Sequence, residues 1–302
     1  MTRFPGGLQH HVYDCLLPDG QRVVARLCIA DQADIMRSAA AWSDELRPRG
    51  LPLPVILFRD LQAAMPGLLL ARLPGTDLGN VIGALTSPQR STIAREVVAW
   101  QQIAAALPQV SGYGYALHGQ QPPHRFWSDV LATHLSRSRA RFGTGIEPIR
   151  RAFTALRKVL RELQPDLRRI DPTPFLHDTT TKNVIVHETA VTGLVDVDDL
   201  CHGDPRFAAA LTTAALIATG GPLDYVRAWL AASHAEPDRC FALYVALFAL
   251  DIISESGHRF NRDQPVATEP NPRLMRLLGA LVAAASGDDG GWFGKIADRE
   301  VA

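Results

Sequence analysis

One stretch of the chain, residues 175–205, constrains the fold more than any other, because polar residues stand at the ends of two short apolar runs. Asp178 lies five positions before Asn183, and an apolar triplet at 184–186 follows at once. This order predicts a short loop that enters a β-strand. A turn and a second apolar run then lead to Asp196. The stretch therefore predicts a pair of strands with three oxygen-bearing side chains near their ends.

These three side chains match what phosphoryl transfer requires. Transfer of a nucleotide γ-phosphate needs one carboxylate that orients or deprotonates the attacking hydroxyl, and oxygen ligands that hold Mg²⁺ on the phosphates. Asp178, Asn183 and Asp196 offer such a set. The spacing alone is a weak signal, because Asp and Asn are common loop residues. An ordinary β-hairpin with polar ends is the alternative interpretation.

A Gly-Asp-Pro tripeptide at 203–205 completes the pattern. With it, the segment resembles the aminoglycoside phosphotransferase family and its choline-kinase-like relatives, which share this order of catalytic loop, metal-binding aspartate and Gly-Asp-Pro. The resemblance implies that Asp178 is the catalytic base and that Asn183 and Asp196 hold Mg²⁺. It also implies ATP or GTP as the co-substrate.

Two positions depart from the family pattern. The family usually has a His two places before the catalytic Asp, where this chain has Leu176, and His177 directly precedes Asp178 instead. The family also usually has an Asp four residues after the Asp of Gly-Asp-Pro, where this chain has Ala208. Both departures concern residues that brace the loop, so they bear on details of the site more than on the class of reaction.

The N-terminal part of the chain predicts a small β-sheet. Apolar runs at 12–17 and 23–29 are separated by Pro-Asp-Gly-Gln, a composition suited to a hairpin turn. The resemblance places a phosphate-binding Lys or Arg in the second run, and Arg26 is the residue available there. A guanidinium group can bind phosphate oxygens in a bidentate manner. An outward-facing Arg26 on a half-exposed strand is the alternative.

A glycine pair, Gly6 and Gly7, precedes this hairpin. A Gly-containing loop that leads into a strand can lie over phosphates with its backbone N–H groups exposed. Two glycines alone are a weak signal, and a flexible N-terminus is the alternative.

The helix expected at 33–46 lacks one group that kinases normally have. In kinases this helix supplies a Glu to the phosphate-binding Lys or Arg, yet residues 39–41 are alanines here. Either Asp34, Asp44 or Glu45 substitutes for that Glu, or the pair is absent, and the sequence leaves both possibilities open.

The strands give way to helices after two further apolar runs, at 52–57 and 68–73. The second run leads into a Pro-Gly break that fits a hinge between two lobes. Backbone groups near Leu70 and Arg72 would then meet the edge of an adenine or guanine base.

Helical spacing dominates the C-terminal half, with helices expected at 207–219, 225–234 and 238–258. The last of these holds an acidic pair, Asp251 and Glu255, which lie four residues apart and hence on one face. Like charges at that spacing cost roughly a few tenths of a kcal/mol, so a positive partner is expected nearby.

Two kinds of partner fit this acidic pair. One is Arg259 or Arg262, further along the chain. The other is a cationic substrate, because this region forms part of the acceptor pocket in the family resembled. Asp198 and Asp199, just past the proposed metal ligand, either extend the acidic site towards the acceptor or cap the following turn.

Composition narrows the class of partner further. The 302 residues include 31 basic and 31 acidic side chains, so no overall field favours nucleic acid or an anionic membrane. The longest apolar run, 241–250, is far below the roughly 20 residues that a membrane helix needs. No secretory signal is visible at the start, so we expect a cytoplasmic protein. The four Cys show no CxxC pairing, which favours reduced thiols.

The sequence therefore predicts a bilobal, protein-kinase-like α+β fold, with a small β-rich N-lobe at residues 1–73 and a mainly helical C-lobe at 74–302. The predicted reaction is Mg²⁺-dependent transfer of the γ-phosphate of ATP or GTP to a hydroxyl of a small molecule. An amine-bearing acceptor, such as an aminoglycoside or amino alcohol, is one candidate. The alternative function is a nucleotide-binding pseudokinase that acts through a partner. The sequence leaves the acceptor and the oligomeric state open.

Overall fold

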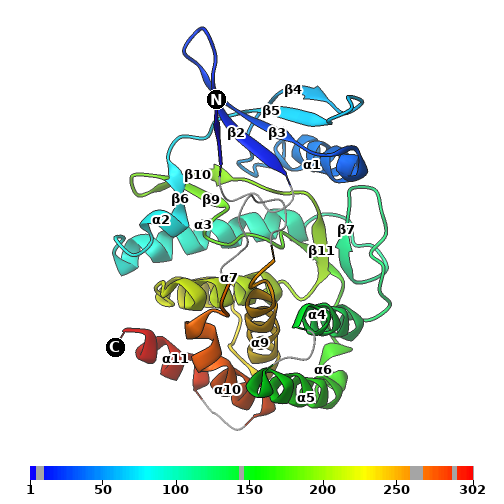
Figure 1. Cartoon of the computed structure of the whole chain (residues 1–302), viewed down its shortest axis with the longest axis vertical. Coiled ribbons are helices and arrows are strands. Elements are labelled where there is room, and N and C mark those ends of the chain that lie inside the picture. The colour runs from blue at the N-terminus through cyan, green and yellow to red at the C-terminus, as the bar shows by residue number, and fades with distance from the viewer. Residues whose placement is uncertain (5–9, 143–145, 259–267, 288–290, 302) are drawn as a thin grey trace.

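The computed structural model describes residues 1–4, 10–142, 146–258, 268–287 and 291–301. Within these ranges an antiparallel sheet forms the N-terminal part, and helices dominate the rest (Figure 1). This architecture confirms the predicted α+β fold. The placement of the lobe boundary between residues 73 and 74 stays a proposal. Four residues named above lie outside the described residues: Gly6, Gly7, Arg259 and Arg262.

The N-terminal sheet has the strand order β1-β2-β3-β5-β4, with every neighbouring pair antiparallel. Its strands are β1 (Thr2–Arg3), β2 (His11–Leu16), β3 (Arg22–Leu27), β4 (Ile56–Asp60) and β5 (Gly67–Ala71). A short 3-10 turn (Ala30–Gln32) leads into α1 (Ala33–Leu46), which lies against the sheet (Figure 1). Met36, Ala39 and Ala40 of the helix meet Cys28 and Leu68 in a small core of their own.

The predicted hairpin turn joins β2 to β3. Leu17 N–H donates to Gln21 O at 2.8 Å, and Gly20 N–H donates to Leu17 O at 3.0 Å. Gly20 has a φ of 85°, a left-handed conformation that glycine adopts without the steric penalty of a Cβ. The turn chemistry of the sequence thus sets the register of the first two long strands.

The strand predicted at 52–57 is displaced towards the C-terminus, and β4 begins only at Ile56. Pro52 and Pro54 have no backbone N–H to donate to a ladder, which accounts for the late start. The proline pair therefore belongs to the connection between α1 and the sheet.

Two small sheets lie between the N-terminal sheet and the main helices (Figure 1). One has the order β10-β9-β6 and the other the order β7-β11-β8. Their strands are β6 (Thr76–Asp77), β7 (Gly114–Ala116), β8 (Thr173–Phe175), β9 (Val184–His187), β10 (Ala190–Leu194) and β11 (Leu200–Gly203). Gly75, with a φ of 101°, lets the chain pass close to β9, since a Cβ there would overlap the carbonyl of Val186.

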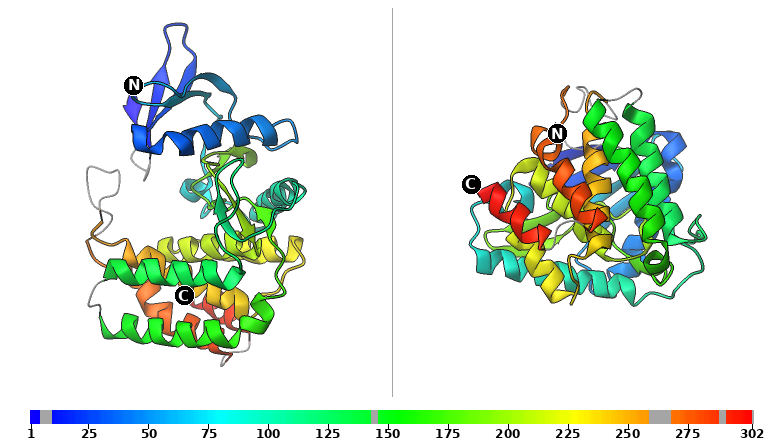
Figure 2. Two further views of the ribbon diagram at one scale, coloured as in Figure 1. Left: turned by 90° about the vertical axis from the view of Figure 1, so that its right-hand side faces the viewer. Right: turned by 90° about the horizontal axis from the view of Figure 1, so that it is seen from below.

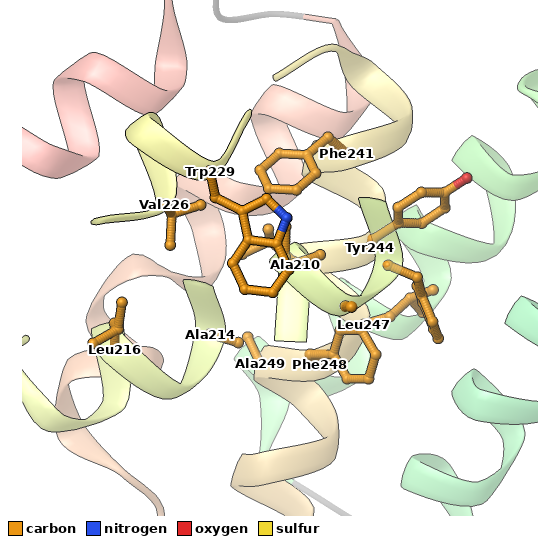
Figure 3. Packing of buried hydrophobic residues seen from close by; sticks show 14 of the residues in the cluster. Ala210, Ala214, Leu216, Val226, Trp229, Phe241, Tyr244, Leu247, Phe248 and Ala249 are labelled. Carbon is orange, nitrogen blue, oxygen red and sulfur yellow. The ribbon is translucent and has the colours of Figure 1, made fainter. Parts of the chain in front are cut away.

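The helical part is built around α9 (Arg239–Ser254), whose residues from Cys240 to Leu250 are all buried. It packs against α4, α7 and α10 (Figure 2). Figure 3 shows Phe241, Tyr244 and Phe248 of α9 among side chains from α7 and α8. The other helices are α2 (Leu78–Val81), α3 (Ser87–Ala105), α4 (Trp127–Phe142), α5 (Glu147–Glu162), α6 (Gln164–Leu167), α7 (Arg206–Thr219), α8 (Asp224–Ala232), α10 (Pro272–Ser286) and α11 (Trp292–Val301). Among the described helices, none has the length and apolar character needed to cross a membrane.

Candidate active site

The loop predicted to be catalytic connects β8 to β9 and carries Asp178. The Thr180 hydroxyl donates to Asp178 Oδ1 at 2.7 Å, and Lys182 Nζ lies 3.0 Å from Asp178 Oδ2. Asn183 donates through Nδ2 to the backbone O of Asp178 at 2.9 Å. The loop thus closes on itself and holds Asp178 at both its carboxylate and its carbonyl.

The surroundings of Asp178 favour its charged form. Burial alone would raise the pKa of this carboxyl, but the positive charge of Lys182 and the hydrogen bond from Thr180 outweigh burial and hold the pKa below its ordinary value. Asp178 is therefore a carboxylate at neutral pH. It can accept a hydrogen bond from a hydroxyl that approaches the loop.

A buried glutamine from α3 braces the same loop from the interior. Gln101 Oε1 accepts from Leu176 N–H at 2.9 Å, while Gln101 Nε2 donates to Leu176 O at 2.8 Å and to Thr179 Oγ1 at 3.0 Å. Leu176, which stands where the family usually has His, is itself in the core. Sequence reasoning missed Gln101. The signal was an amide side chain four residues after Val97, on the apolar face of a helix.

Arg26 of β3 points into the site. Its side chain is only 8% exposed, and its Nη2 lies 2.6 Å from Asp196 Oδ1 and 2.7 Å from Asp198 Oδ2. The outward-facing alternative is therefore excluded. Both carboxylates follow β10, so Arg26 ties the N-terminal sheet to the segment that carries the proposed metal ligand.

Asp198 is held from several sides. Its Oδ2 also lies 3.0 Å from His10 Nε2, whereas its Oδ1 is buried with no hydrogen-bond partner in the described part of the chain. Ser38 of α1 donates to Asp198 O at 2.6 Å and accepts from His118 N–H at 2.8 Å. Burial opposes ionisation of Asp198, but Arg26 and His10 outweigh it and lower the pKa of Asp198.

The acidic side chains of α1 do not reach Arg26. Each of the three candidates, Asp34, Asp44 and Glu45, has a different basic partner at 2.6 to 2.9 Å. Arg26 therefore forms no ion pair with an acidic residue of α1. Its acidic partner is Asp198, in the segment that follows β10.

Asp196 and Asn183 offer oxygens that suit Mg²⁺. Asp196 has a left-handed φ of 68° and uses Oδ1 for Arg26, while Asn183 uses its Nδ2 within the loop. Asp196 Oδ2 and Asn183 Oδ1 remain as hard donors, and Mg²⁺ typically takes one or two protein oxygens together with phosphate oxygens and water. No group of three or more His, Cys, Asp or Glu side chains able to hold a metal occurs among the described residues. A metal here would therefore share its coordination with a nucleotide.

Asp199 adds a further carboxylate to this region. No described residue donates a hydrogen bond to it, so it does not cap the following turn. Burial, reinforced by the negative charges of Asp198, Asp196 and Asp178, raises the pKa of Asp199 to about 7. The side chain is thus poised between its charged and neutral forms near neutral pH.

The acidic pair at the end of α9 has its positive partners on α4. Asp251, 13% exposed, accepts from Arg137 Nη2 at 2.6 Å and from Arg141 Nη1 at 2.9 Å. Ser138 also donates to Asp251 at 3.0 Å, and Glu255 lies 3.9 Å from Arg141. Positive partners of the acidic pair are therefore present on α4, whereas the two arginines proposed from the sequence lie outside the described residues.

The two residues proposed near the nucleotide base lie at the end of β5. Leu70 pairs with Val24 of β3 and with Ile56 of β4. Arg72 follows the strand, and its guanidinium lies over the Phe4 ring, 5.2 Å from the centroid, so its side chain extends along the sheet. A role in base binding would therefore come from the backbone, and it stays a proposal.

Lys182 is the second site residue that sequence reasoning missed. It is one of only three lysines in the chain and lies beside Asp178 in the catalytic loop. Burial would lower the pKa of Lys182, but Asp178 and Asp196 outweigh burial and raise it, so the ammonium is retained. The scarcity of lysine was the available signal.

The fold is the protein-kinase-like fold of the aminoglycoside phosphotransferase structures described below. Residues 1–243 match the model of the phosphotransferase enzyme family. This match covers most of the chain, and the protein therefore belongs to that family. No curated protein matches the sequence.

Solved structures share the fold across nearly the whole chain. A thermostable mutant of the aminoglycoside phosphotransferase APH(4)-Ia, in a ternary complex with AMP-PNP and hygromycin B, has a TM-score of 0.62 at 14% identity and covers 100% of this chain and 94% of its own. The streptomycin–ATP complex of APH(2")-IIa has a TM-score of 0.59 at 11% identity, covering 94% and 92%. A putative fructosamine-3-kinase from Thermobifida fusca YX-ER1 has a TM-score of 0.53 at 17% identity, covering 99% and 91%. At these identities the likeness establishes the fold.

Proposed function

We propose that the protein is a Mg²⁺-dependent kinase that transfers the γ-phosphate of ATP or GTP to a hydroxyl of a small molecule. The observation that carries this proposal is the convergence of four side chains from distant segments, Asp178, Asn183, Asp196 and Arg26. Asn183 is bonded to Asp178 within the loop, and Arg26 is bonded to Asp196 across the site. Membership in the phosphotransferase enzyme family supports the same reaction class.

The charges at this place favour a metal–nucleotide complex. Four carboxylates face two cations: Asp178, Asp196, Asp198 and Asp199 against Arg26 and Lys182. An excess of carboxylates attracts a divalent cation, and a guanidinium and an ammonium bind phosphate oxygens. The complex of Mg²⁺ with a nucleoside triphosphate supplies both kinds of charge.

Each side chain then has a defined task. Asp178 orients the acceptor hydroxyl and accepts its proton, and Lys182, 3.0 Å away, places positive charge beside the phosphate under attack. Arg26 contacts phosphate oxygens, and its ion pair with Asp198 keeps the guanidinium in position. Asn183 and Asp196 would hold Mg²⁺, which, when bound, neutralises the charge of the phosphates.

An amine-bearing acceptor, such as an aminoglycoside or an amino alcohol, is the finer part of the proposal. Asp199 supports it, because this carboxylate has no partner among the described residues and lies in a cluster of negative charge that a cation would stabilise. Structural relatives carry hygromycin B or streptomycin in their complexes, which adds support.

A screen for label transfer tests the function. The wild type and Asp178→Asn are incubated with Mg²⁺ and either γ-labelled ATP or γ-labelled GTP, against a library of aminoglycosides, amino alcohols, sugars and neutral alcohols. We expect transfer that requires Mg²⁺ and that Asp178→Asn abolishes. Nucleotide binding without transfer to any acceptor would instead indicate the pseudokinase.

A further inference from the structure

A row of four polar side chains runs from α4 through β7 to the catalytic loop. Arg137 Nη2 lies 3.1 Å from His134 Nδ1. His134 Nε2 lies 2.8 Å from Tyr115 Oη, which in turn lies 3.2 Å from His177 Nε2 and 3.5 Å from His177 Nδ1. His177 immediately precedes Asp178, so the row ends at the residue proposed to meet the acceptor.

The chemistry of arginine fixes the direction of the hydrogen bonds as far as the Tyr115 hydroxyl, and the shorter of the two Tyr115–His177 contacts selects His177 Nε2 as the next acceptor. A guanidinium only donates, so Arg137 donates to His134 Nδ1, and a neutral His134 then carries its proton on Nε2. His134 donates to Tyr115 Oη, and the Tyr115 hydroxyl donates to His177 Nε2. His177 consequently carries its proton on Nδ1.

The surroundings keep both imidazoles neutral and limit their other partners. Burial is the largest cause of a pKa of His134 well below its ordinary value, and of a pKa of His177 of about 4. Phe207 and Phe248 pack against both imidazoles, with ring centroids 5.2 to 6.0 Å apart. Apolar rings at these positions offer no competing hydrogen bonds, so within the part of the chain that the structure describes the two imidazoles bond only to Arg137 and Tyr115.

We propose that this row is a one-way hydrogen-bond chain that orients the catalytic loop, and that Tyr115 and His134 are positioning residues for phosphate transfer. The inference rests on the proposed function, in which Asp178 meets the acceptor hydroxyl. Gln101 forms hydrogen bonds with the loop on either side of His177, at Leu176 and Thr179. The hydrogen-bond chain fixes the position of His177 itself. The chain thereby replaces the bracing that the family usually obtains from a His two positions before the catalytic Asp.

The direction of the chain can be tested without any activity. In the full-length protein labelled with ¹⁵N-histidine, long-range proton–nitrogen NMR spectra distinguish the two neutral tautomers. We expect the proton on Nε2 of His134 and on Nδ1 of His177, and we expect Tyr115→Phe to shift the signals of both. The matched control is Tyr113→Phe, which removes a neighbouring hydroxyl that donates to Ile170 O at 2.7 Å and should leave both signals unchanged. The opposite tautomer at either histidine would overturn the chain.

The positioning role is tested by kinetics with an acceptor that the screen identifies. Tyr115→Phe should lower kcat by about tenfold and leave the nucleotide KM unchanged, since a small displacement of a reacting group reduces rate more than affinity. Tyr113→Phe should retain the wild-type kcat. Equal kcat values for the two variants would overturn the positioning role. A wild type that phosphorylates no acceptor would overturn the proposed function and this role with it, while the tautomers still decide whether the chain exists.

Discussion

The two acidic regions of the site are neutralised to different degrees. On the proposed nucleotide side, Asp196 and Asp198 share a single guanidinium, that of Arg26, His10 is the one further partner of the Asp198 carboxylate among the described residues, and the other oxygen of Asp198 is buried without a partner there. On the proposed acceptor side, Asp251 and Glu255 face two arginines of α4. Carboxylates are in excess in the first region and in balance with cations in the second.

This difference separates the ligands that the two regions suit. Carboxylates at short range repel one another unless a cation lies between them, so the nucleotide side gains most from bound Mg²⁺. On the proposed acceptor side, a bound cation adds little stabilisation. Asp251 and Glu255 already have arginine partners there, and they must release these partners before they can bind an amine. Asp199, for which the described residues offer no basic partner, is the stronger candidate for binding an acceptor amine in the proposed function.

The largest effect is expected at Asp178, the proposed catalytic base. Asp178→Asn should lower kcat by on the order of 10²-fold or more, the usual contribution of a positioned base, while nucleotide affinity stays near that of the wild type. Steady-state kinetics and nucleotide titration calorimetry measure the two quantities. Asp224→Asn, which removes a carboxylate paired with Arg90 on α3, serves as the control and should keep full activity. Near-normal turnover by Asp178→Asn would falsify its assignment as the base.

A smaller effect is expected on the nucleotide side. Arg26→Ala should weaken triphosphate binding by roughly 1.5–3 kcal/mol, the range for a lost charge-assisted hydrogen bond, and should change nucleoside binding much less. Calorimetry with both ligands gives the comparison. Arg22→Ala, on the same strand but paired with Asp14 at the surface, is the matched control. If Arg26→Ala bound triphosphate as tightly as the wild type, Arg26 would serve only to tie the aspartates together.

The acceptor side should respond more weakly. Asp251→Asn should raise KM for an amine-bearing acceptor, leave the nucleotide KM unchanged, and lower the free energy of unfolding by about 1–2 kcal/mol through loss of its charged hydrogen bonds. Glu255→Gln should act in the same direction. Asp199→Asn should raise the acceptor KM more than Asp251→Asn or Glu255→Gln does. This comparison directly tests whether Asp199, and not the acidic pair of α9, binds the amine. Efficient turnover of a neutral or anionic acceptor would rule out a cationic pocket.

The smallest effect concerns pH. His177 has a pKa of about 4 in the folded protein, against an ordinary value of about 6.5. Between these values the unfolded chain binds more protons, so stability rises with pH across this window and is lost as the pH falls through it. His177 is only partly buried, so we expect acidification through this window to lower the Tm of the wild type by only a few degrees more than that of His177→Gln. Thermal melts at several acidic pH values test this, and parallel curves for the two proteins would mean that His177 is not held neutral.

Elements whose causes are local could be predicted from the amino-acid sequence. The helix predicted at 33–46 has those bounds in the structure, and the turn predicted at 18–21 joins β2 to β3. Apolar spacing and turn chemistry act over a few residues, so a linear reading captures them. The displaced start of β4 shows the limit of such a reading, because an apolar run at 52–57 outweighed its two prolines in the prediction.

Which side chains meet in the site depends on how distant segments pack together in the folded chain. Arg26 donates hydrogen bonds to Asp196 and Asp198, which are 170 and 172 residues away in the sequence. Gln101 donates a hydrogen bond to the backbone of the catalytic loop 75 residues away. From the sequence, an acidic residue of the following helix was one possible partner of Arg26 and the absence of such a pair was the other, and Asp198 was not among the candidates for this pair. Charge interactions fall off within a few ångströms of contact, and the way in which the sheet packs on the helical part sets which groups come that close. Local pattern therefore fixed the residues of the loop, while long-range packing fixed the electrostatics that give them their proposed tasks.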